Sequence, residues 1–203
     1  MLKSTIFREY DIRGIADTDL PSDGITELGK ALGTYIRRQA GKKICLARDV
    51  RLSGDRLHAA MLKGLMAAGC DVIDVGRVPT PLLYFACVHL QADGGVMITG
   101  SHNPSEYNGF KTVCGSGTIH GHAIQEVREM IEKQDYLSGA GTQQTYDIMT
   151  PYVDEVAKQF DFKRRVKVVL DAGNGTAGPT LERLFARLNC EVTPLFYEMD
   201  GHF

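Results

Sequence analysis

An α/β fold, with a mixed sheet flanked by helices, is predicted for this chain by three observations. Short apolar runs alternate along the first 135 residues with longer segments whose apolar residues recur every three or four positions. These two periods are typical of strands and amphipathic helices. Glycine, proline and serine residues separate the segments. The 203 residues, 43% hydrophobic and 24% charged, suit a soluble globular protein larger than one minimal domain. Such alternation is typical of layered α/β domains.

Each predicted element has its own local signal. Ser22 and Ser53 precede helical stripes as N-caps, Gly69 ends the second helix, and Pro79 opens the third. Residues 95–99 are too short and too β-branched for a helix. In chain order, we expect a helix over residues 25–36, a strand over 43–47, a helix over 57–68, a strand over 71–75, a helix over 79–90, a strand over 95–99 and a helix over about 124–133.

A second unit is predicted after a linker. Residues 135–150 are rich in Gly, Ser, Thr and Gln, so we place domain 1 at 1–148 and the start of domain 2 at 149–203. KVVLD (167–171) and NCEVTPLF (189–196) echo KICLARD (43–49) and GCDVIDVG (69–76). The echo predicts a strand, a helix and a strand, either as a true duplication or as general β-α-β patterning. Two strands cannot bury both faces of a parallel sheet, so we expect an incomplete second α/β domain.

Charge, hydropathy and cysteine content exclude several classes of protein. Lys and Arg number 23 against 25 Asp and Glu, so the net charge of −2 argues against nucleic acid or anionic membrane partners. No apolar run approaches the roughly 20 residues that span a bilayer. The N-terminus lacks the apolar core of a signal peptide. Five cysteines without a C-x-x-C pair predict reduced, buried thiols in a cytoplasmic protein.

The segment TGSHNPSEYNGFK (99–111) carries the strongest chemical signal. Ser101 follows a buried strand that ends at Gly100, and ligands usually bind at the carboxyl ends of such strands. Asn108–Gly109 is a turn pair that we expect to fold a surface loop back, so that Lys111 comes near Ser101. A purely structural polar loop is the alternative. A hydrolase nucleophile is disfavoured because the G-x-S-x-G elbow is absent, and adjacent residues such as His102 project in different directions.

Two further segments carry arginines that suit anions. In FREYDIRG (7–14), Arg13 beside Gly14 suits bidentate contact with a phosphate or carboxylate, although pairing with Asp11 in a surface turn is the alternative. Residues 48–51 (RDVR) follow another strand, hence lie at the same sheet edge as the TGSHNP segment. Their alternative role is structural ion pairing.

Three other motifs favour less specific interpretations. GNGTAG (173–178) matches the dinucleotide-binding fingerprint, which keeps an oxidoreductase open, but tight strand-to-helix turns often produce this match. His120 and His122 lack a suitably spaced Cys or carboxylate, so exposed loop histidines are expected in place of a metal pair. Residues 163–165 (KRR) are expected to form a solvated loop.

Taken in order and spacing, five segments resemble the motifs of one family. They are FREYDIRG (7–14), ARDVRLSG (47–54), VPTP (78–81), GVMITGSHNPSEYNGFK (95–111) and LDAGNGTAG (170–178). The chain resembles the α-D-phosphohexomutases over essentially all its length, most closely the bacterial phosphomannomutase/phosphoglucomutase members. Glycine at position 100 favours that branch, because the phosphoglucosamine mutases, the alternative branch, usually carry alanine there.

The resemblance implies an isomerase that works through a phosphoserine. Ser101 matches the family serine that passes its phosphoryl group to a hexose 1-phosphate or 6-phosphate (mannose or glucose), making a bisphosphate sugar that reorients. Arg13 and Lys111 match the cations near that phosphate, which carries about −1.5 to −2 charge. Tyr10 matches a residue that touches sugar hydroxyls, and His102 is a candidate proton shuttle. The resemblance also implies Mg²⁺, with a phosphate oxygen on Ser101 as one ligand.

The sequence lacks other parts of that family's pattern. The three aspartates of the D-G-D-x-D metal loop, the sugar-recognition loop and the distal phosphate-binding loop are not in these residues. We therefore expect the N-terminal, phosphoserine-bearing part of a phosphohexomutase, unable by itself to complete turnover. The alternative is a truncated fragment that binds phosphosugar without catalysis. Open sheet edges in an incomplete second domain would invite association with other chains.

Overall fold

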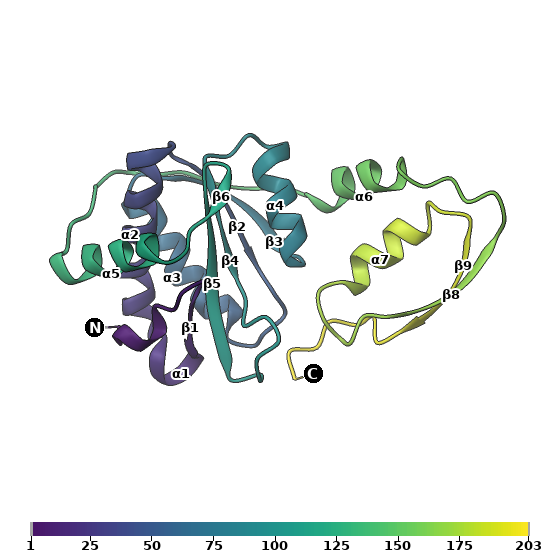
Figure 1. Ribbon diagram of the computed structural model, residues 1–203, viewed down its shortest axis with the longest axis horizontal. Helices are drawn as coiled ribbons and strands as arrows, with labels where there is room; N and C mark the ends of the chain where they lie inside the picture. The colour runs from purple at the N-terminus through teal and green to yellow at the C-terminus, as the bar shows by residue number, and fades with distance from the viewer. Residues whose placement is uncertain (1, 203) are drawn as a thin grey trace.

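The computed structural model describes residues 2–202; Figure 1 shows a larger layered part around one sheet and a smaller part that holds β8, β9 and α7. In chain order they are the 3₁₀ helix η1 (Ser4–Ile6), β1 (Ile12–Ile15), α1 (Ala16–Asp19), α2 (Ser22–Gln39), β2 (Lys43–Arg48), α3 (Gly54–Ala67), β3 (Asp71–Arg77), α4 (Thr80–His89), β4 (Gly94–Ile98), β5 (Tyr107–Cys114), β6 (Gly117–Thr118), α5 (His122–Lys133), β7 (Gln143–Thr145), α6 (Met149–Ala157), β8 (Val166–Asp171), α7 (Gly178–Phe185) and β9 (Cys190–Leu195).

Strands β1 to β7 form a mixed sheet of seven strands, which confirms the predicted fold class. Its main order is β1-β5-β4-β2-β3-β7, and β6 pairs with β5. β2 runs parallel to β3 and β4, and β3 runs parallel to β7. β5 is antiparallel to both β1 and β4. The antiparallel half therefore brings the N-terminal strand next to the strand that follows the Ser101 loop.

Helices cover both faces of this sheet. Alternate side chains of β2 point into two different cores: Ile44 and Leu46 pack with α2, α3 and α5, whereas Cys45 and Ala47 pack with α4. Figure 1 shows α2, α3 and α5 on one side of the sheet and α4 on the other. Residues 44–47 are consequently all buried, as central parallel strands usually are. No helix within residues 2–202 is long and apolar enough to cross a membrane.

All seven helices and strands predicted for the first part are present, but several predictions about turns and linkers were wrong. Asn108 and Gly109 form no turn; both are buried within β5, and the chain reverses earlier, over residues 101–106. The Ser53 hydroxyl makes no helix-capping hydrogen bond; instead it accepts one from Asn108 Nδ2 at 2.9 Å. The predicted linker contains β7, whose backbone extends the sheet beside β3.

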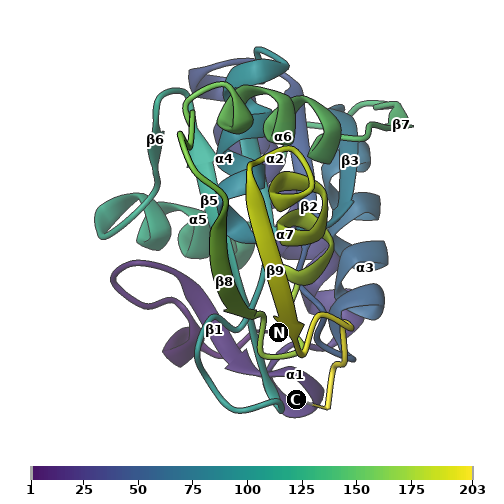
Figure 2. The same cartoon turned by 90° about the vertical axis from the view of Figure 1, so that its right-hand side faces the viewer.

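The second unit is a β-α-β arrangement, as the sequence echo predicts. β8 and β9 pair in parallel, with α7 between them in sequence (Figure 2). Burial alternates along β8, and the outward Val169 side chain is 65% exposed. α6 contacts both α4 and α7, so it links the two sheets. The boundary between residues 148 and 149 stays a prediction.

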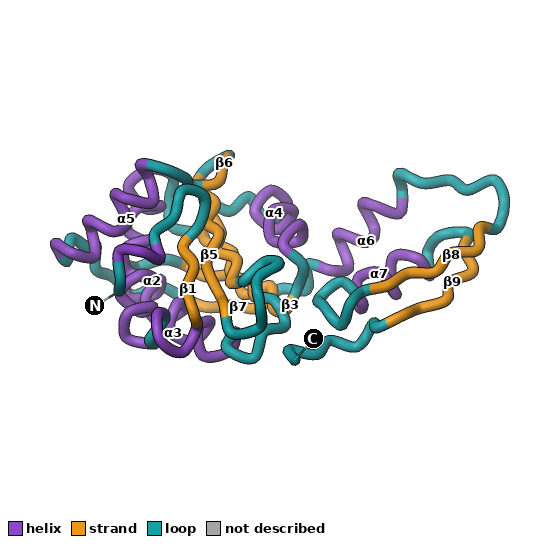
Figure 3. The backbone as a smooth tube through the Cα atoms, turned by 60° about the horizontal axis from the view of Figure 1, so that its bottom comes forward, coloured by secondary structure: helices purple, strands orange, loops and turns teal. Residues whose placement is uncertain are grey.

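The chain after β9 returns to the first unit. Figure 3 shows the C-terminal segment running back from β9 toward the seven-stranded sheet. A Cβ added at Gly201 would lie 2.8 Å from both the Val50 carbonyl oxygen and Leu52 Cδ2. The loop after β2 therefore touches the end of the second unit as well as the sheet edge where Ser101 lies.

Cysteine burial agrees in part with the sequence analysis. All five thiols are free; Cys45, Cys70 and Cys87 are buried, whereas Cys114 and Cys190 are half-buried. Burial raises the pKa of the Cys70 thiol to about 12. That thiol is therefore protonated and unreactive at neutral pH.

Candidate functional site

The candidate site lies where β1, β2, β4 and β5 meet at one edge of the sheet. β2 and β4 run side by side, with Arg48 opposite Ile98, so their following loops emerge together. The backbone N–H of Asp49 donates to the Ile98 carbonyl oxygen at 2.9 Å. The prediction that RDVR (48–51) shares the sheet edge of the TGSHNP segment is therefore confirmed.

Ser101 lies exposed in a turn with a positive φ of 54°. A non-glycine residue occupies this left-handed region only when its surroundings hold it there. The backbone N–H of Ser101 donates to Thr99 Oγ1 at 2.9 Å, and the Thr99 hydroxyl donates to Asp49 Oδ2 at 2.7 Å. The side chain of Thr99 thus fixes the peptide that presents the Ser101 hydroxyl to solvent.

His102 lies closer to Ser101 than the sequence argument expects. Its Nδ1 is 3.2 Å from Ser101 Oγ, and both side chains are exposed. The left-handed turn at Ser101 is the physical reason, because it brings two neighbouring side chains together that an extended strand would separate. Within residues 2–202, His102 makes no hydrogen bond to a carboxylate, so no Ser-His-Asp triad is assembled.

Arg13 and Lys111 lie on neighbouring antiparallel strands and share one carboxylate. Arg13 on β1 is opposite Gly109, and Lys111 is two residues farther along β5. The Asp11 carboxylate forms an ion pair with Arg13 and lies 3.9 Å from Lys111 Nζ. The pairing of Asp11 with Arg13, which was the alternative for this segment, is present, although Arg13 lies on β1 and not in a surface turn. The position of Lys111 in a surface loop was wrong, because β5 includes it and its side chain is only 29% exposed.

Asp11, Arg13 and Lys111 form a cluster, here called the Asp11 cluster, in which one N–H donor of Arg13 has no partner among the described residues. Arg13 Nε is buried without a hydrogen-bond partner among the described residues, although burial of an unpaired donor is unfavourable. Asp11 is itself 8% exposed and balances part of the charge of two cations. Within residues 2–202, neither Arg13 nor Lys111 forms a hydrogen bond or ion pair with Ser101; both pair with Asp11.

Tyr10 immediately precedes this cluster and faces solvent. Its side chain is 75% exposed, and it makes no hydrogen bond or ring contact within the described residues. Such a phenol can donate to, or accept from, a ligand that sits over the sheet edge. The structure thus leaves Tyr10 accessible without assigning it a ligand.

Arg51 belongs to the RDVR segment (48–51) that the sequence placed at this sheet edge, but its position underneath the Ser101 loop was not predicted. Its Nη2 donates to the Ser101 carbonyl oxygen at 3.0 Å and to that of Asn103 at 2.7 Å. The only sequence signal was the position of Arg51 just after a strand, which structural ion pairing explained equally well. The contact joins residues 50 and 52 positions apart, so local patterns do not reveal it.

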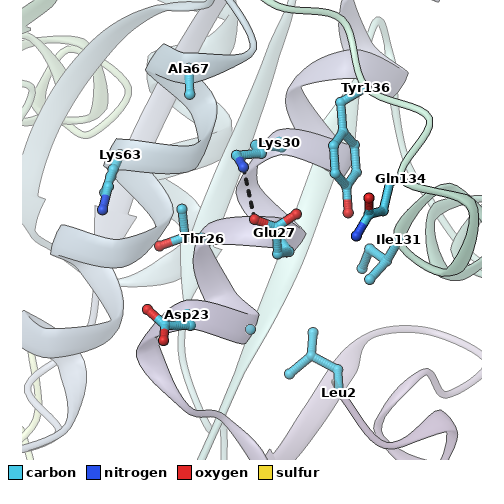
Figure 4. Close-up of a pocket in the computed structure, with 11 residues that line it drawn as sticks. Leu2, Asp23, Thr26, Glu27, Lys30, Lys63, Ala67, Ile131, Gln134 and Tyr136 are labelled. Carbon is cyan, nitrogen blue, oxygen red and sulfur yellow. Dashed lines mark hydrogen bonds and ion pairs between the residues drawn. The ribbon is translucent and has the colours of Figure 1, made fainter.

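Two cavities differ in their position relative to the Ser101 loop; one adjoins the loop and the other does not. One of about 530 Å³ lies beside the Ser101 loop, where Ser105 and Glu106 face Arg56 and the C-terminal residues 201–202. A second, of about 460 Å³, lies between α2, α3 and α5, as Figure 4 shows. Lys30 Nζ bonds Glu27 there at 2.8 Å. No residue of the Ser101 loop lines this second cavity.

The described residues do not assemble a metal-binding cluster. No group of three or more His, Cys, Asp or Glu side chains within residues 2–202 is arranged to hold an ion. His122 instead pairs with Glu126 at 2.9 Å on the first turn of α5, and its side chain is 88% exposed.

The GNGTAG segment packs as a strand-to-helix turn. The backbone N–H of Gly173 donates to Asp171 Oδ1 at 2.8 Å, and Gly173 has a positive φ of 54°. A Cβ at Gly178 would lie 2.0 Å from the Tyr197 carbonyl oxygen. Close packing of α7 on the returning chain accounts for the last glycine without a dinucleotide.

Comparison with known proteins agrees with this architecture. Residues 4–138 match the family described as phosphoglucomutase/phosphomannomutase, alpha/beta/alpha domain I. The chain is 42% identical over 202 residues to the phosphomannomutase/phosphoglucomutase of Pseudomonas aeruginosa, covering 100% of this chain and 44% of that protein. It is 42% identical to a phosphoglucomutase of Neisseria gonorrhoeae, covering 98% of this chain and 44% of the relative.

A solved structure extends the likeness to the whole fold. The phosphoglucomutase/phosphomannomutase family protein of Burkholderia thailandensis superimposes with a TM-score of 0.94 at 41% identity, covering 100% of this chain and 46% of that one. The chain thus spans less than half the length of the relatives it matches. By its family match and its close relatives, the chain belongs to the phosphoglucomutase/phosphomannomutase family.

Proposed function

We propose that this chain supplies the phosphoserine-bearing part of a phosphohexomutase, an isomerase that interconverts hexose 1-phosphate and hexose 6-phosphate. The observation that carries the proposal is the exposed Ser101 hydroxyl, held in a left-handed turn at the carboxyl end of β4. Membership of the family supports it. Turnover by a whole enzyme, with glucose or mannose phosphates, belongs to the proposal because the chain spans only part of its relatives.

In the proposed reaction, Ser101 alternates between a free hydroxyl and a phosphate ester. A sugar hydroxyl attacks the phosphorus of phosphoserine, the bond from phosphorus to Ser101 Oγ breaks, and the sugar proton ends on Oγ. The resulting bisphosphate sugar reorients and returns its other phosphoryl group to Ser101. We propose that His102 carries that proton; the 3.2 Å between its Nδ1 and Ser101 Oγ supports this role.

Arg13 and Lys111 would stabilise the transferring phosphoryl group. Phosphoryl transfer depends mainly on positioning and on cations near the developing charge. The two side chains already share the Asp11 carboxylate, which holds them on one face of β1 and β5. We propose that the incoming anion binds Arg13 and Lys111 in partial exchange for Asp11. Tyr10, at 75% exposure, would contact sugar hydroxyls.

The proposed Mg²⁺ would have one ligand from this chain, a phosphate oxygen on Ser101. The described residues offer no cluster to complete its coordination. A hard cation with oxygen ligands would neutralise phosphate charge when bound. The remaining ligands would come from outside these residues.

We also propose a partner and a cellular location for the protein. Hexose phosphate is the small-molecule partner, with no nucleic acid or membrane partner, and a cytoplasmic location is inferred from composition. Phosphoglucosamine mutase remains the alternative branch, and a phosphosugar-binding fragment without catalysis remains the alternative class. Association through the open edges of β8 and β9 is part of the proposal.

Mass spectrometry of the 203-residue chain tests the phosphoserine. The chain is analysed as isolated from cells and again after incubation with glucose 1,6-bisphosphate. We expect one phosphoryl group on the peptide that contains Ser101, and none in Ser101→Ala. Ser105→Ala, in the same exposed loop, is the matched control and should still be phosphorylated. Absence of phosphate from the wild-type chain, or its presence on Ser105 instead, contradicts the proposal.

A second measurement separates a partial enzyme from a complete one. The 203-residue chain is assayed for conversion of mannose 1-phosphate to mannose 6-phosphate with a coupled enzyme readout. We expect no appreciable turnover even when Ser101 is phosphorylated, because the chain spans only 44% of its relatives. Sustained turnover would show that these residues suffice for the whole cycle.

A further inference from the structure

Arg51 lies in the loop between β2 and α3, and its side chain is completely buried. Its guanidinium group extends beneath residues 100–107, the loop that presents Ser101. Burial of a cation is unfavourable unless hydrogen bonds and charges compensate for it. The contacts of Arg51 therefore explain why the charge is tolerated there.

The five N–H groups of the guanidinium match five acceptors. Four of these are backbone carbonyl oxygens of the Ser101 loop, at 3.0, 2.7, 2.6 and 2.8 Å, on Ser101, Asn103, Pro104 and Tyr107. The fifth is Asp49 Oδ2, 3.3 Å from Arg51 Nε. A planar fork with five donors matches this arrangement, whereas a lysine ammonium has three donors and no fixed plane.

Gly100 makes room for this guanidinium. A Cβ added at Gly100 would lie 2.4 Å from Arg51 Cζ and 2.5 Å from its Nε. Even the methyl group of alanine would therefore displace the Arg51 side chain or the loop. Gly100 has no positive φ, so close approach to Arg51, rather than backbone freedom, accounts for glycine at this position.

Asp49 connects Arg51 to Ser101 by a second path. One oxygen of its carboxylate accepts from the Arg51 backbone N–H at 3.0 Å. The other accepts from Arg51 Nε and from the Thr99 hydroxyl, which in turn accepts from the Ser101 N–H. Both the carbonyl and the N–H of Ser101 are thus held, one directly by Arg51 and the other through Asp49 and Thr99.

We propose that Arg51 is a positioning residue that holds Ser101 in its left-handed turn and thereby sets the rate of phosphoryl transfer at the Ser101 hydroxyl. This inference rests on the proposed phosphoserine function. Arg51 acts through the loop, because its buried side chain does not reach a ligand in solvent. The rigid fork, rather than positive charge alone, is the property that the loop needs, since it fixes four carbonyls at once.

Uptake of a phosphoryl group from glucose 1,6-bisphosphate by the 203-residue chain tests this role. Arg51→Lys keeps the charge and loses the fork, whereas Arg51→Met loses both. We expect both variants to lower the maximal rate of Ser101 phosphorylation about a hundredfold, the effect of misplacing a reacting group by about 1 Å. The bisphosphate concentration that gives half the maximal rate should change less than about twofold.

A matched control separates this role from arginine substitution in general. Arg37 Nη1 also donates to a backbone carbonyl, that of Ala68 at 2.6 Å, but far from the Ser101 loop. Arg37→Lys should phosphorylate Ser101 at the wild-type rate. A rate for Arg51→Lys close to wild type would overturn the proposal, because charge alone would then suffice.

Gly100→Ala provides a test in which Arg51 itself is not substituted. Alone, it should slow phosphorylation because the new methyl group meets the guanidinium. Combined with Arg51→Lys, it should add little, since the longer, planar group that it displaces is already gone. Two independent sites would instead multiply their effects. A multiplicative result would overturn the coupling of Gly100 to Arg51.

Hydrogen exchange reports on the loop without any phosphoryl transfer. The backbone N–H groups of Ser101, Asn103 and Tyr107 are hydrogen-bonded within the loop. In Arg51→Lys they should exchange about tenfold faster or more, while β4 amides keep wild-type protection. Unchanged loop exchange overturns the proposal. A wild-type chain that takes up no phosphoryl group contradicts the proposed function itself, whereas normal uptake by Arg51→Lys contradicts only the role of Arg51.

Discussion

The chain contains the same β-α-β arrangement twice, in two very different surroundings. β2 and β3 belong to the seven-stranded sheet, α3 packs on one face of it, and residues 44–47 of β2 are all buried. β8, α7 and β9 form a two-stranded parallel sheet in which half-buried and exposed residues alternate along β8. The registers are equally regular in both, apart from a shift between Leu46 and Ala47.

The comparison shows that a β-α-β arrangement forms from one continuous segment of sequence, whereas the burial of its strands depends on other segments of the chain. A strand, a helix and a parallel strand can form from one continuous segment, and both segments do so. Burial on both faces needs further strands and helices, and only the first unit has β4, β7 and α4 around it. The Ser101 loop belongs to the fully enclosed unit, where a rigid sheet can hold a strained turn.

The largest expected effect comes from removing core volume in the enclosed unit. Leu46→Ala shortens a side chain that is 0% exposed, so it should lower the free energy of unfolding of the first unit by about 2–5 kcal/mol. Val169→Ala, at 65% exposure on β8, should change stability by less than about 0.5 kcal/mol. Chemical denaturation followed by circular dichroism measures both. Equal losses would remove the contrast between the two units.

A smaller effect is expected where helices pack through glycine. In Gly64→Ala the new Cβ would lie 2.2 Å from the Thr26 carbonyl oxygen, so α2 and α3 must move apart, at a cost of about 1–3 kcal/mol. Gly117→Ala, with open space around its Cβ, is the matched control and should leave the melting temperature nearly unchanged. A Gly64→Ala variant as stable as wild type would mean that α2 and α3 can move apart at little cost in stability.

The smallest expected effect is a pH dependence of stability that arises from Asp71, the first residue of β3. Hydrogen bonds from Lys42 and then from Thr142 lower the pKa of Asp71, at the start of β3, to about 2. Because the folded-state pKa lies below the usual value of 3.8, this contribution to stability is present above about pH 4 and is lost as pH falls toward 2.

Asp71→Asn should therefore flatten the decline of the melting temperature between about pH 4 and 2. Asp161→Asn is the control, because Asp161 is 78% exposed in the second unit. Its melting curve should follow wild type throughout the range. An Asp71→Asn curve parallel to wild type below pH 4 would show that the contacts of Asp71 with Lys42 and Thr142 add nothing to stability.

Much of the first unit could be predicted from its sequence because its signals are local. Helical stripes over 25–36 and 57–68 and apolar runs over 43–47 and 71–75 correspond to α2, α3, β2 and β3. β1 and β7 were missed since each is short and is stabilised by a partner far along the chain. The Asn108–Gly109 turn was wrong because pairing of β5 with β1 and β4 outweighed a local turn preference.

For the candidate site too, some features could be predicted from local sequence and others depend on strand pairing. Ser101 could be placed at the end of a strand from the sequence, and RDVR (48–51) at the same sheet edge. That Lys111 lies on a strand, and that Arg13 and Lys111 share Asp11, depends on β1 pairing with β5. Their proposed roles toward a phosphate stay predictions for the phosphorylation experiments.

By itself the sequence determined the α/β class, the order of most elements, the family resemblance and the serine at the end of β4. Each of these depends on spacing within a few tens of residues. Only the tertiary structure decided that Arg51 lies beneath the Ser101 loop, with carbonyl acceptors 50 to 56 residues away. Such contacts follow from sheet order, which places distant segments side by side, and no local period encodes that order.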